Sequence, residues 1–143
     1  MTGAPATAIL WPAVAMASLT FLVWVRLYHL RLGEMARKRI DAQALASAAD
    51  SARLLLDTRA SDNFRNLFEL PVLFYAGVLL AAQLGVSDSA SLALAWAFVG
   101  LRVVHSVVHC TFNHVMTRFI AYALATLVLI AFWMRLAIAL AAA

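Results

Sequence analysis

Four long apolar stretches dominate the chain and restrict what it can fold into. They lie at about residues 8–28, 67–84, 91–115 and 119–142, and each is close to the ~20 residues with which an α-helix crosses the hydrocarbon core of a bilayer. The composition agrees, because 65% of the 143 residues are apolar and 13% are charged, whereas soluble domains are roughly half apolar and a quarter charged. We therefore predict an all-α integral membrane protein, a single domain built as a four-transmembrane-helix bundle.

The charged residues are unevenly distributed along this chain. The net charge is +4, and most of the basic side chains lie in the connection between the first two stretches, about residues 29–66. An excess of Lys and Arg in one connection is typical of the cytoplasmic side of a membrane protein, so we interpret it as topology and not as nucleic-acid binding. The turn at residues 85–89 contains no basic residue. With an even number of spans, we predict that both termini lie outside, in a bacterial inner membrane.

The sequence around the second span predicts how its helix is built. Residues 41–66 contain no Gly or Pro and place apolar residues at three- and four-residue steps between Leu45 and Leu56. Helix two should therefore begin well before the membrane. Pro71 lies inside the second span, where its missing N–H should bend the helix and free a backbone carbonyl.

Polar side chains form a stripe on each of the last three predicted helices, near the predicted cytoplasmic ends. With about 100° per residue, the members of each stripe share one helix face. An ionised side chain at membrane depth costs from about 2.5 kcal/mol upwards, so such residues usually face the bundle interior and mark a site. The stripes are Arg59, Asp62, Asn63, Asn66 and Glu69 on the second helix, Arg102, His105, His109 and Asn113 on the third, and Arg118 and Tyr122 on the fourth.

Several of these residues also have an ordinary structural explanation. Asn63 and Asn66 can cap or hydrate the point where helix two enters the membrane. Glu69 lies a turn deeper and needs a cationic partner such as Arg102 or Arg118, so a purely structural buried pair is an alternative to a binding site.

The histidines and the single cysteine also allow ordinary structural explanations. His105 and His109 are four residues apart and could ligate a metal from one helix face, but neither Cys nor carboxylate stands beside them, so we predict no metal site. His109 is alternatively a core histidine bonded to a carbonyl that Pro71 frees. Cys110 is expected to be a small core residue. Arg135, near the far end of the fourth helix, is expected to reach the external headgroups.

Two segments carry motifs of a known family. Residues 65–71 are Arg-Asn-Leu-Phe-Glu-Leu-Pro, with an Asn-x-x-Glu motif at the start of the second span. Residues 102–122 combine Arg-x-x-His with a later Arg-x-x-x-Tyr. Together they resemble the MAPEG family, the membrane-associated proteins in eicosanoid and glutathione metabolism, and specifically its microsomal glutathione transferase and prostaglandin E synthase branch. The resemblance also covers length, number of spans and topology.

The resemblance implies a homotrimer that binds glutathione as a co-substrate between neighbouring subunits, near the cytoplasmic face. By position, Arg118 would activate the glutathione thiol, and Arg102 would be a pocket or supporting charge. Members of the prostaglandin E synthase branch have tyrosine where this chain has His109, which puts an eicosanoid substrate in doubt. The family's first-helix arginine has three candidates here, Arg26, Arg31 and Arg37. The full set of binding residues implied is Arg65, Asn66, Glu69, Arg102, His105, His109 and Tyr122.

Thiol chemistry agrees with the polar stripes. A guanidinium close to a thiol favours the thiolate, which is the nucleophilic form, and an arginine keeps its charge at any ordinary pH. We therefore predict a membrane-embedded glutathione transferase or peroxidase that acts on hydrophobic electrophiles or lipid hydroperoxides arriving from the bilayer. The main alternative is a non-catalytic membrane protein of the same fold that binds an anionic ligand or has a structural role. A small transporter is a third, less favoured class.

Overall fold

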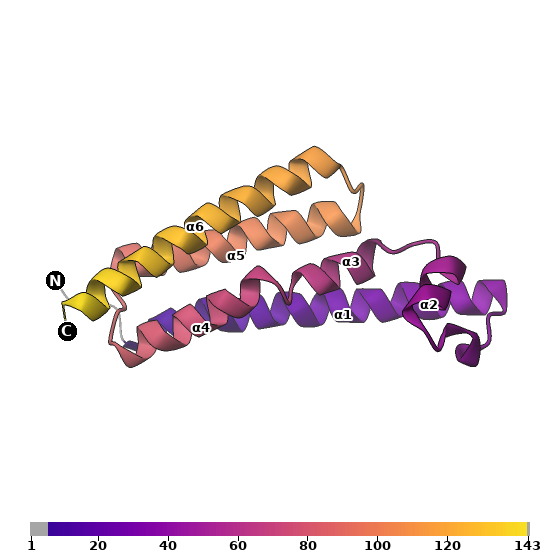
Figure 1. Cartoon of the computed structure of the whole chain (residues 1–143), viewed down its shortest axis with the longest axis horizontal. Coiled ribbons are helices and arrows are strands. Elements are labelled where there is room, and N and C mark those ends of the chain that lie inside the picture. Colours follow the sequence, from indigo (N-terminus) through magenta and orange to yellow (C-terminus); the bar gives the residue numbers. More distant parts are fainter. Residues whose placement is uncertain (1–5, 143) are drawn as a thin grey trace.

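The chain forms a bundle of helices in a computed structural model that describes residues 6–142 (Figure 1). Within that range the secondary structure is entirely helical apart from turns and loops. Four helical segments are long and apolar enough to span a membrane: Thr7–Lys38, Arg59–Gln83, Ser89–Cys110 and Val115–Ala141. The predicted fold class is therefore confirmed as an all-α bundle with four candidate membrane spans.

The first helix is longer than its apolar stretch. A 3-10 turn, η1 (Ala6–Leu10), leads into α1 (Trp11–Lys38). Pro12 lies in the first turn of α1, where a helix does not need the missing N–H. The helix ends at Arg39, which adopts the left-handed conformation with φ 53°. Because α1 continues to Lys38, its last turns stand beside the connection that follows.

The connection after α1 is helical in three short pieces, so the prediction that the second helix begins well before its apolar stretch holds from Arg59 onward and fails for residues 41–58. It contains η2 (Ala42–Leu45), α2 (Ala48–Leu54) and α3 (Arg59–Asn66), with extended backbone between α2 and α3. The Leu56 N–H donates to Glu34 Oε1 at 3.0 Å instead of to a helical carbonyl. Hydrogen bonds from side chains compete with the helix in this way, and a partner on α1 could not be predicted from the local pattern.

The second span is broken just before Pro71 and not bent at it. Helix α3 ends at Asn66, three residues of irregular backbone follow, and α4 (Leu70–Gln83) begins with Pro71 in its first turn. The N–H groups of a helix's first turn have no partner within the helix, so a proline there loses no hydrogen bond. In a helix interior a proline would remove one. The break therefore moves to the residues that precede the proline.

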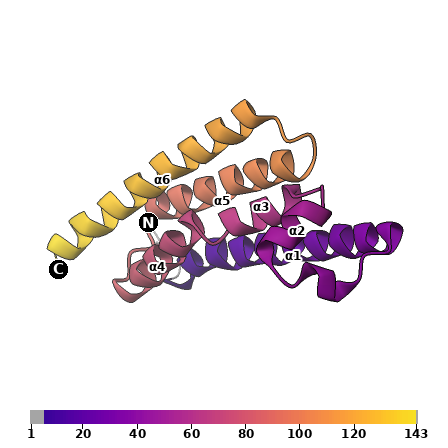
Figure 2. The same cartoon turned by 45° about the vertical axis from the view of Figure 1, so that its right-hand side comes forward.

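Aromatic side chains fill the middle of the bundle. Helices α5 (Ser89–Cys110) and α6 (Val115–Ala141) run side by side in both views (Figures 1 and 2). Phe74 of α4 stacks on Phe98 of α5 with ring centroids 4.5 Å apart, and Phe132 of α6 completes the layer at 6.4 Å from Phe74. A Cβ at Gly77 would lie 3.1 Å from the Phe132 ring, so this glycine allows α4 and α6 to approach.

The bundle has two chemically different ends (Figure 1). We call one the turn end: it contains the α4–α5 turn at residues 84–88 and the C-terminal part of α6. We call the other the loop end: it contains α2, α3, the last turns of α1 and the α5–α6 loop at residues 111–114. The polar stripes lie toward the loop end.

Candidate functional site

A buried arginine forms the deepest part of a polar cluster at the loop end. Arg102 of α5 is fully buried, and its Nη2 donates to the Asn66 carbonyl at 2.9 Å. That carbonyl is accessible because α3 ends there. The guanidinium carbon lies 5.6 Å from the centre of the Tyr122 ring on α6, a cation–π distance. Its Nε and Nη1 are buried and have no hydrogen-bond partner within the part of the chain that the structure describes.

His105 lies one turn further along α5. Its Nδ1 is 3.1 Å from the Arg118 carbonyl oxygen, and because a carbonyl can only accept, Nδ1 carries the proton. On a neutral ring Nε2 then has a free lone pair, and this atom is buried without a partner among residues 6–142. The His105 ring lies 5.5 Å from His109 and 5.8 Å from Tyr122, measured between ring centroids. His109 Nδ1 is also buried and unpartnered.

Arg118 enters the cluster from the first turn of α6. It is half-buried, and its Nη1 donates to the Asn113 side-chain carbonyl at 2.7 Å. Asn113 belongs to the α5–α6 loop and has φ 51°, a left-handed conformation that asparagine tolerates better than most residues. The loop therefore positions the guanidinium of Arg118, while the backbone of Arg118 fixes the tautomer of His105.

Two of the residues implied by the family resemblance lie outside this cluster in the single chain. The Arg65 side chain is 73% exposed and lies 3.8 Å from Asp62. Glu69 is exposed and takes part in none of the ion pairs among residues 6–142, so the expected buried pair with Arg102 or Arg118 is absent there. The break after Asn66 explains this, because Glu69 does not continue the face that α3 presents to α5.

Asn63 has a packing role that the sequence did not indicate. It is fully buried, its Nδ2 donates to Cys110 Sγ at 3.3 Å, and its Oδ1 accepts from Ser106 Oγ at 3.3 Å. It therefore joins α3 to α5 and does not hydrate the edge of the membrane. Ser106 and Cys110 are four residues apart on one face of α5, which is the pattern that could have indicated a buried polar partner.

Two arginines hold the C-terminal end of α5. Arg26 of α1 donates to the Cys110 carbonyl at 3.0 Å, and Arg59 of α3 donates to the Thr111 carbonyl. The last carbonyls of a helix lack partners within the helix and carry its negative dipole end, so cations stabilise them. Arg59 also pairs with Asp57 at 2.7 Å, and this hydrogen bond lowers the pKa of Asp57.

A comparison with protein-family models matches the MAPEG family over residues 9–138. The chain belongs to the MAPEG family. This family includes glutathione transferases and peroxidases, so the resemblance is confirmed at family level. Neither the search of curated proteins nor the search of solved structures found a match.

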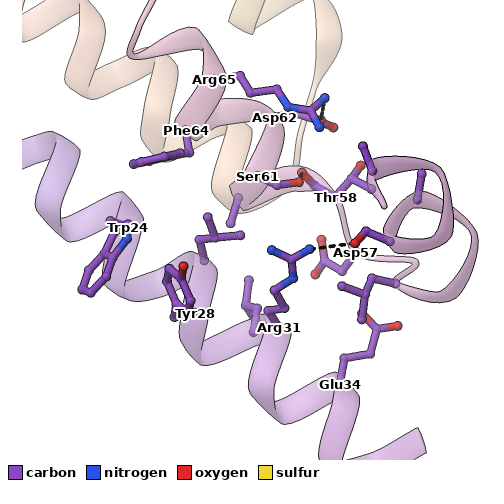
Figure 3. A pocket seen from close by; sticks show the side chains of 17 residues that line it. Trp24, Tyr28, Arg31, Glu34, Asp57, Thr58, Ser61, Asp62, Phe64 and Arg65 are labelled. Atoms are coloured by element: carbon purple, nitrogen blue, oxygen red, sulfur yellow. Dashed lines mark hydrogen bonds and ion pairs between the residues drawn. The ribbon is translucent and has the colours of Figure 1, made fainter. Parts of the chain in front are cut away.

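The three candidates for the first-helix arginine of this MAPEG chain have different surroundings. Arg26 is engaged with α5, as described above. Arg31 faces a cavity of about 390 Å³ between α1, α2 and α3, where its Nη2 donates to Ser51 Oγ at 3.0 Å (Figure 3). Arg37 is exposed near the end of α1. Across the described part of the chain, His, Cys, Asp and Glu form no group of three or more that could hold a metal ion.

Proposed function

We propose that this MAPEG protein is a glutathione-dependent transferase or peroxidase that acts on hydrophobic electrophiles or lipid hydroperoxides. One observation carries the proposal: four buried nitrogens on a single face of α5, contributed by Arg102, His105 and His109, have no hydrogen-bond partner among the described residues 6–142. Buried polar groups are almost always hydrogen-bonded. A polar ligand that brings acceptors and one donor would complete them, and glutathione has two carboxylates, amide groups and a thiol.

The residues of the cluster suit the chemistry of a thiol. Arg102 offers the N–H groups of two nitrogens, Nε and Nη1, to a carboxylate or a carbonyl. Arg118 supplies a permanent positive charge that favours the thiolate. His105 Nε2 carries the free lone pair, so it is the group that takes the thiol proton. The thiolate then attacks a carbon electrophile to form a thioether, and the proton on His105 goes to the displaced group or to the adduct. With a hydroperoxide, the thiolate takes the outer oxygen and becomes a sulfenic acid, and the proton on His105 goes to the alkoxide, which leaves as the alcohol. A second glutathione then reacts with the sulfenic acid to give glutathione disulfide and water.

The proposal includes assembly and orientation. Arg65 and Glu69 are exposed on the single chain. In a homotrimer with glutathione between subunits, both residues would contact the ligand and a neighbouring subunit. The apolar side chains that cover the outside of the helices, such as Phe21, Leu79 and Leu127, suit lipid or a second subunit. We propose that the loop end is cytoplasmic and the termini external, as the excess of basic residues before α3 favours.

Assembly and orientation have separate tests. Native mass spectrometry in a mild detergent is expected to give a trimer, and a monomer would count against a shared site. Single cysteines at Ser47 and Ser87, in a Cys110→Ala background, are expected to react with impermeant reagents from opposite sides of the membrane. Reaction from one side only would overturn the four-span topology.

The activity is tested by titrating the detergent-purified protein with glutathione and recording the ultraviolet absorbance of the thiolate. We expect a saturable increase in thiolate absorbance. S-methylglutathione, which has no thiol, should not produce this increase by itself and should suppress it by competing with glutathione. No binding at millimolar glutathione would contradict the proposal. Binding without turnover, in a screen over electrophiles and lipid hydroperoxides, would instead favour a non-catalytic protein that binds an anionic ligand.

A further inference from the structure

One histidine outside the α5 cluster has a defined role in the loop that joins α5 to α6. His114 is the N-cap of α6 and has extended backbone, with φ −71° and ψ 110°. Its Nδ1 accepts from the Thr117 backbone N–H at 3.3 Å and lies 2.8 Å from the Thr117 hydroxyl oxygen. An N-cap of this kind satisfies one of the first N–H groups of a helix, which have no partner within the helix. His114 therefore holds the first turn of α6.

The cap requires a neutral imidazole. A backbone N–H can only donate, so His114 Nδ1 carries a free lone pair and the ring proton lies on Nε2. His105 has the opposite tautomer, since its Nδ1 donates to the Arg118 carbonyl. A doubly protonated ring has a donor on each nitrogen and no acceptor, and its charge would also meet the positive end of the α6 dipole. Protonation of His114 therefore removes the cap.

The turn that His114 holds contains Arg118. The Arg118 backbone N–H donates to the His114 carbonyl at 3.1 Å. Its Nη1 donates to the side chain of Asn113, the residue just before the cap, and its carbonyl accepts from His105. Both connections depend on where the first turn of α6 begins. Loss of the cap would therefore loosen the guanidinium of Arg118 and the ring of His105 together.

We propose that His114 is a positioning residue for Arg118, an inference that rests on the proposed glutathione chemistry, and that it makes thiolate formation sensitive to acid. With a neutral His114 ring, the first turn of α6 is closed and the guanidinium of Arg118 is held in the cluster. With a protonated ring, the turn frays and the thiolate loses its counter-charge. Histidine is the side chain whose charge ordinarily changes between pH 5 and 8, so acidification across this range is expected to open the cap.

The charged neighbours of the loop cannot take over the cap. Among residues 6–142, the charged side chains that hydrogen-bond to residues 110–113 are Arg26 of α1, Arg59 of α3 and Arg118 itself. A guanidinium has no acceptor, and the carboxylate of Asp57 already pairs with Arg59. The acceptor for the Thr117 N–H is therefore His114.

The experiment measures the ratio of thiolate to thiol on bound glutathione, by ultraviolet absorbance at saturating glutathione, at pH 8 and pH 5.5. His114→Asn provides an acceptor that does not titrate, and asparagine is among the best N-caps, whereas His114→Ala provides none. At pH 8, His114→Asn should match wild type, and His114→Ala should lower the ratio about fivefold, the factor that corresponds to one N-cap. Relative to His114→Asn at the same pH, which cancels the titration of the thiol itself, wild type should fall about fivefold between pH 8 and pH 5.5.

Two controls separate positioning from stability. His29→Asn makes the same exchange on the exposed face of α1 and should leave the pH profile of wild type unchanged. Asp88→Ala removes the corresponding cap from α5 and should lower the thermal midpoint without changing the thiolate ratio. Without glutathione, the amide hydrogens of Thr117 and Arg118 should exchange about fivefold faster in His114→Ala than in wild type at pH 8.

The proposal fails if His114→Ala forms as much thiolate as wild type at pH 8. It also fails if wild type and His114→Asn keep the same ratio to each other at both pH values. If wild type forms no thiolate at all, the proposed function fails, and the exchange rates then decide on the cap: equal rates in wild type and His114→Ala would show that His114 does not hold the turn that contains Arg118.

Discussion

The two ends of the bundle use their polar residues in opposite ways. At the turn end, Arg135 pairs with Asp88 at 2.7 Å and donates to Ser91 Oγ at 3.2 Å, while Asp88 accepts from the backbone N–H of Ala90 and Ser91. Arg135 therefore holds α6 to the start of α5 and does not reach out to headgroups as its position suggested. At the loop end, Arg102 and its neighbouring histidines keep buried nitrogens without partners.

This contrast supports the proposal that the loop end binds a ligand and that the turn end is structural. A buried N–H or ring nitrogen without a partner costs about 1–3 kcal/mol, so a fold keeps several of them together only where something else completes them. At the turn end, Arg135, Asp88 and Ser91 complete one another, and among residues 6–142 only the single Trp133 Nε1 on that part of α6 is buried without a partner. We therefore expect substitutions at the loop end to affect binding and activity, and substitutions at the turn end to affect stability alone.

The largest effect is expected from Arg102→Met, which removes the buried charge but fills similar space. Glutathione-dependent turnover should fall by at least about a hundredfold, as for the loss of two charge-assisted hydrogen bonds. The thermal midpoint should stay the same or rise, because replacing a poorly paired buried charge by an apolar side chain is often neutral or stabilising. A large drop in the midpoint would show that Arg102 is mainly structural, and the contrast between the ends would fail.

Arg118→Ala should lower turnover by about tenfold or more while the protein still assembles, since one close charge-assisted interaction contributes about 1.5–3 kcal/mol. Arg118→Lys is the matched control, because it keeps the charge and should retain part of the rate. Steady-state kinetics on the purified oligomer measure both variants. Turnover like that of the wild type in Arg118→Ala would remove this residue from the mechanism.

His109 should have a smaller effect. Its Nδ1 is buried without a hydrogen-bond partner among residues 6–142. A tyrosine hydroxyl can replace the hydrogen bond of a histidine ring to a polar ligand, whereas a phenylalanine ring cannot. His109→Tyr should therefore retain glutathione binding, and His109→Phe should weaken it. Calorimetric titrations of the three proteins measure this, and equal affinity of wild type and His109→Phe would place His109 outside the binding site.

The smallest effect is expected at the turn end. The pKa of Asp88 is lowered to about 2, first by the hydrogen bond from the Ser91 hydroxyl and further by Arg135. Because the folded pKa lies below the ordinary value of about 3.9, the stabilisation is present above about pH 4 and is lost as the pH falls towards 2. Asp88→Asn should cost at most about 1 kcal/mol at neutral pH, as for other partly exposed ion pairs. Thermal unfolding at both pH values tests this, and Asp88→Asn should leave turnover unchanged.

The parts of this molecule that could be predicted from sequence are those determined within one helix. The four apolar stretches indicated the spans, and the spacing of Arg102, His105 and His109 indicated that they share a face of α5. The extended segment between α2 and α3 depends on Glu34. Its carboxylate accepts a hydrogen bond from the Leu56 N–H, which is 22 residues away along the chain. The pairing of Arg135 with Asp88 joins residues 47 apart. Contacts of this kind arise only from tertiary packing, and local periodicity does not contain them.

The central claim is that the unpartnered groups of the loop end are a glutathione site and that the turn end is not. The most direct test is the shift of the thermal midpoint on adding glutathione, because a ligand that binds only the folded state stabilises it. Wild type, Asp88→Asn and Arg118→Ala would be measured side by side. We predict a clear upward shift for wild type and an equal shift for Asp88→Asn from its lower starting point, with little or no shift for Arg118→Ala. No shift in the wild type, or the same shift in all three proteins, would contradict the account.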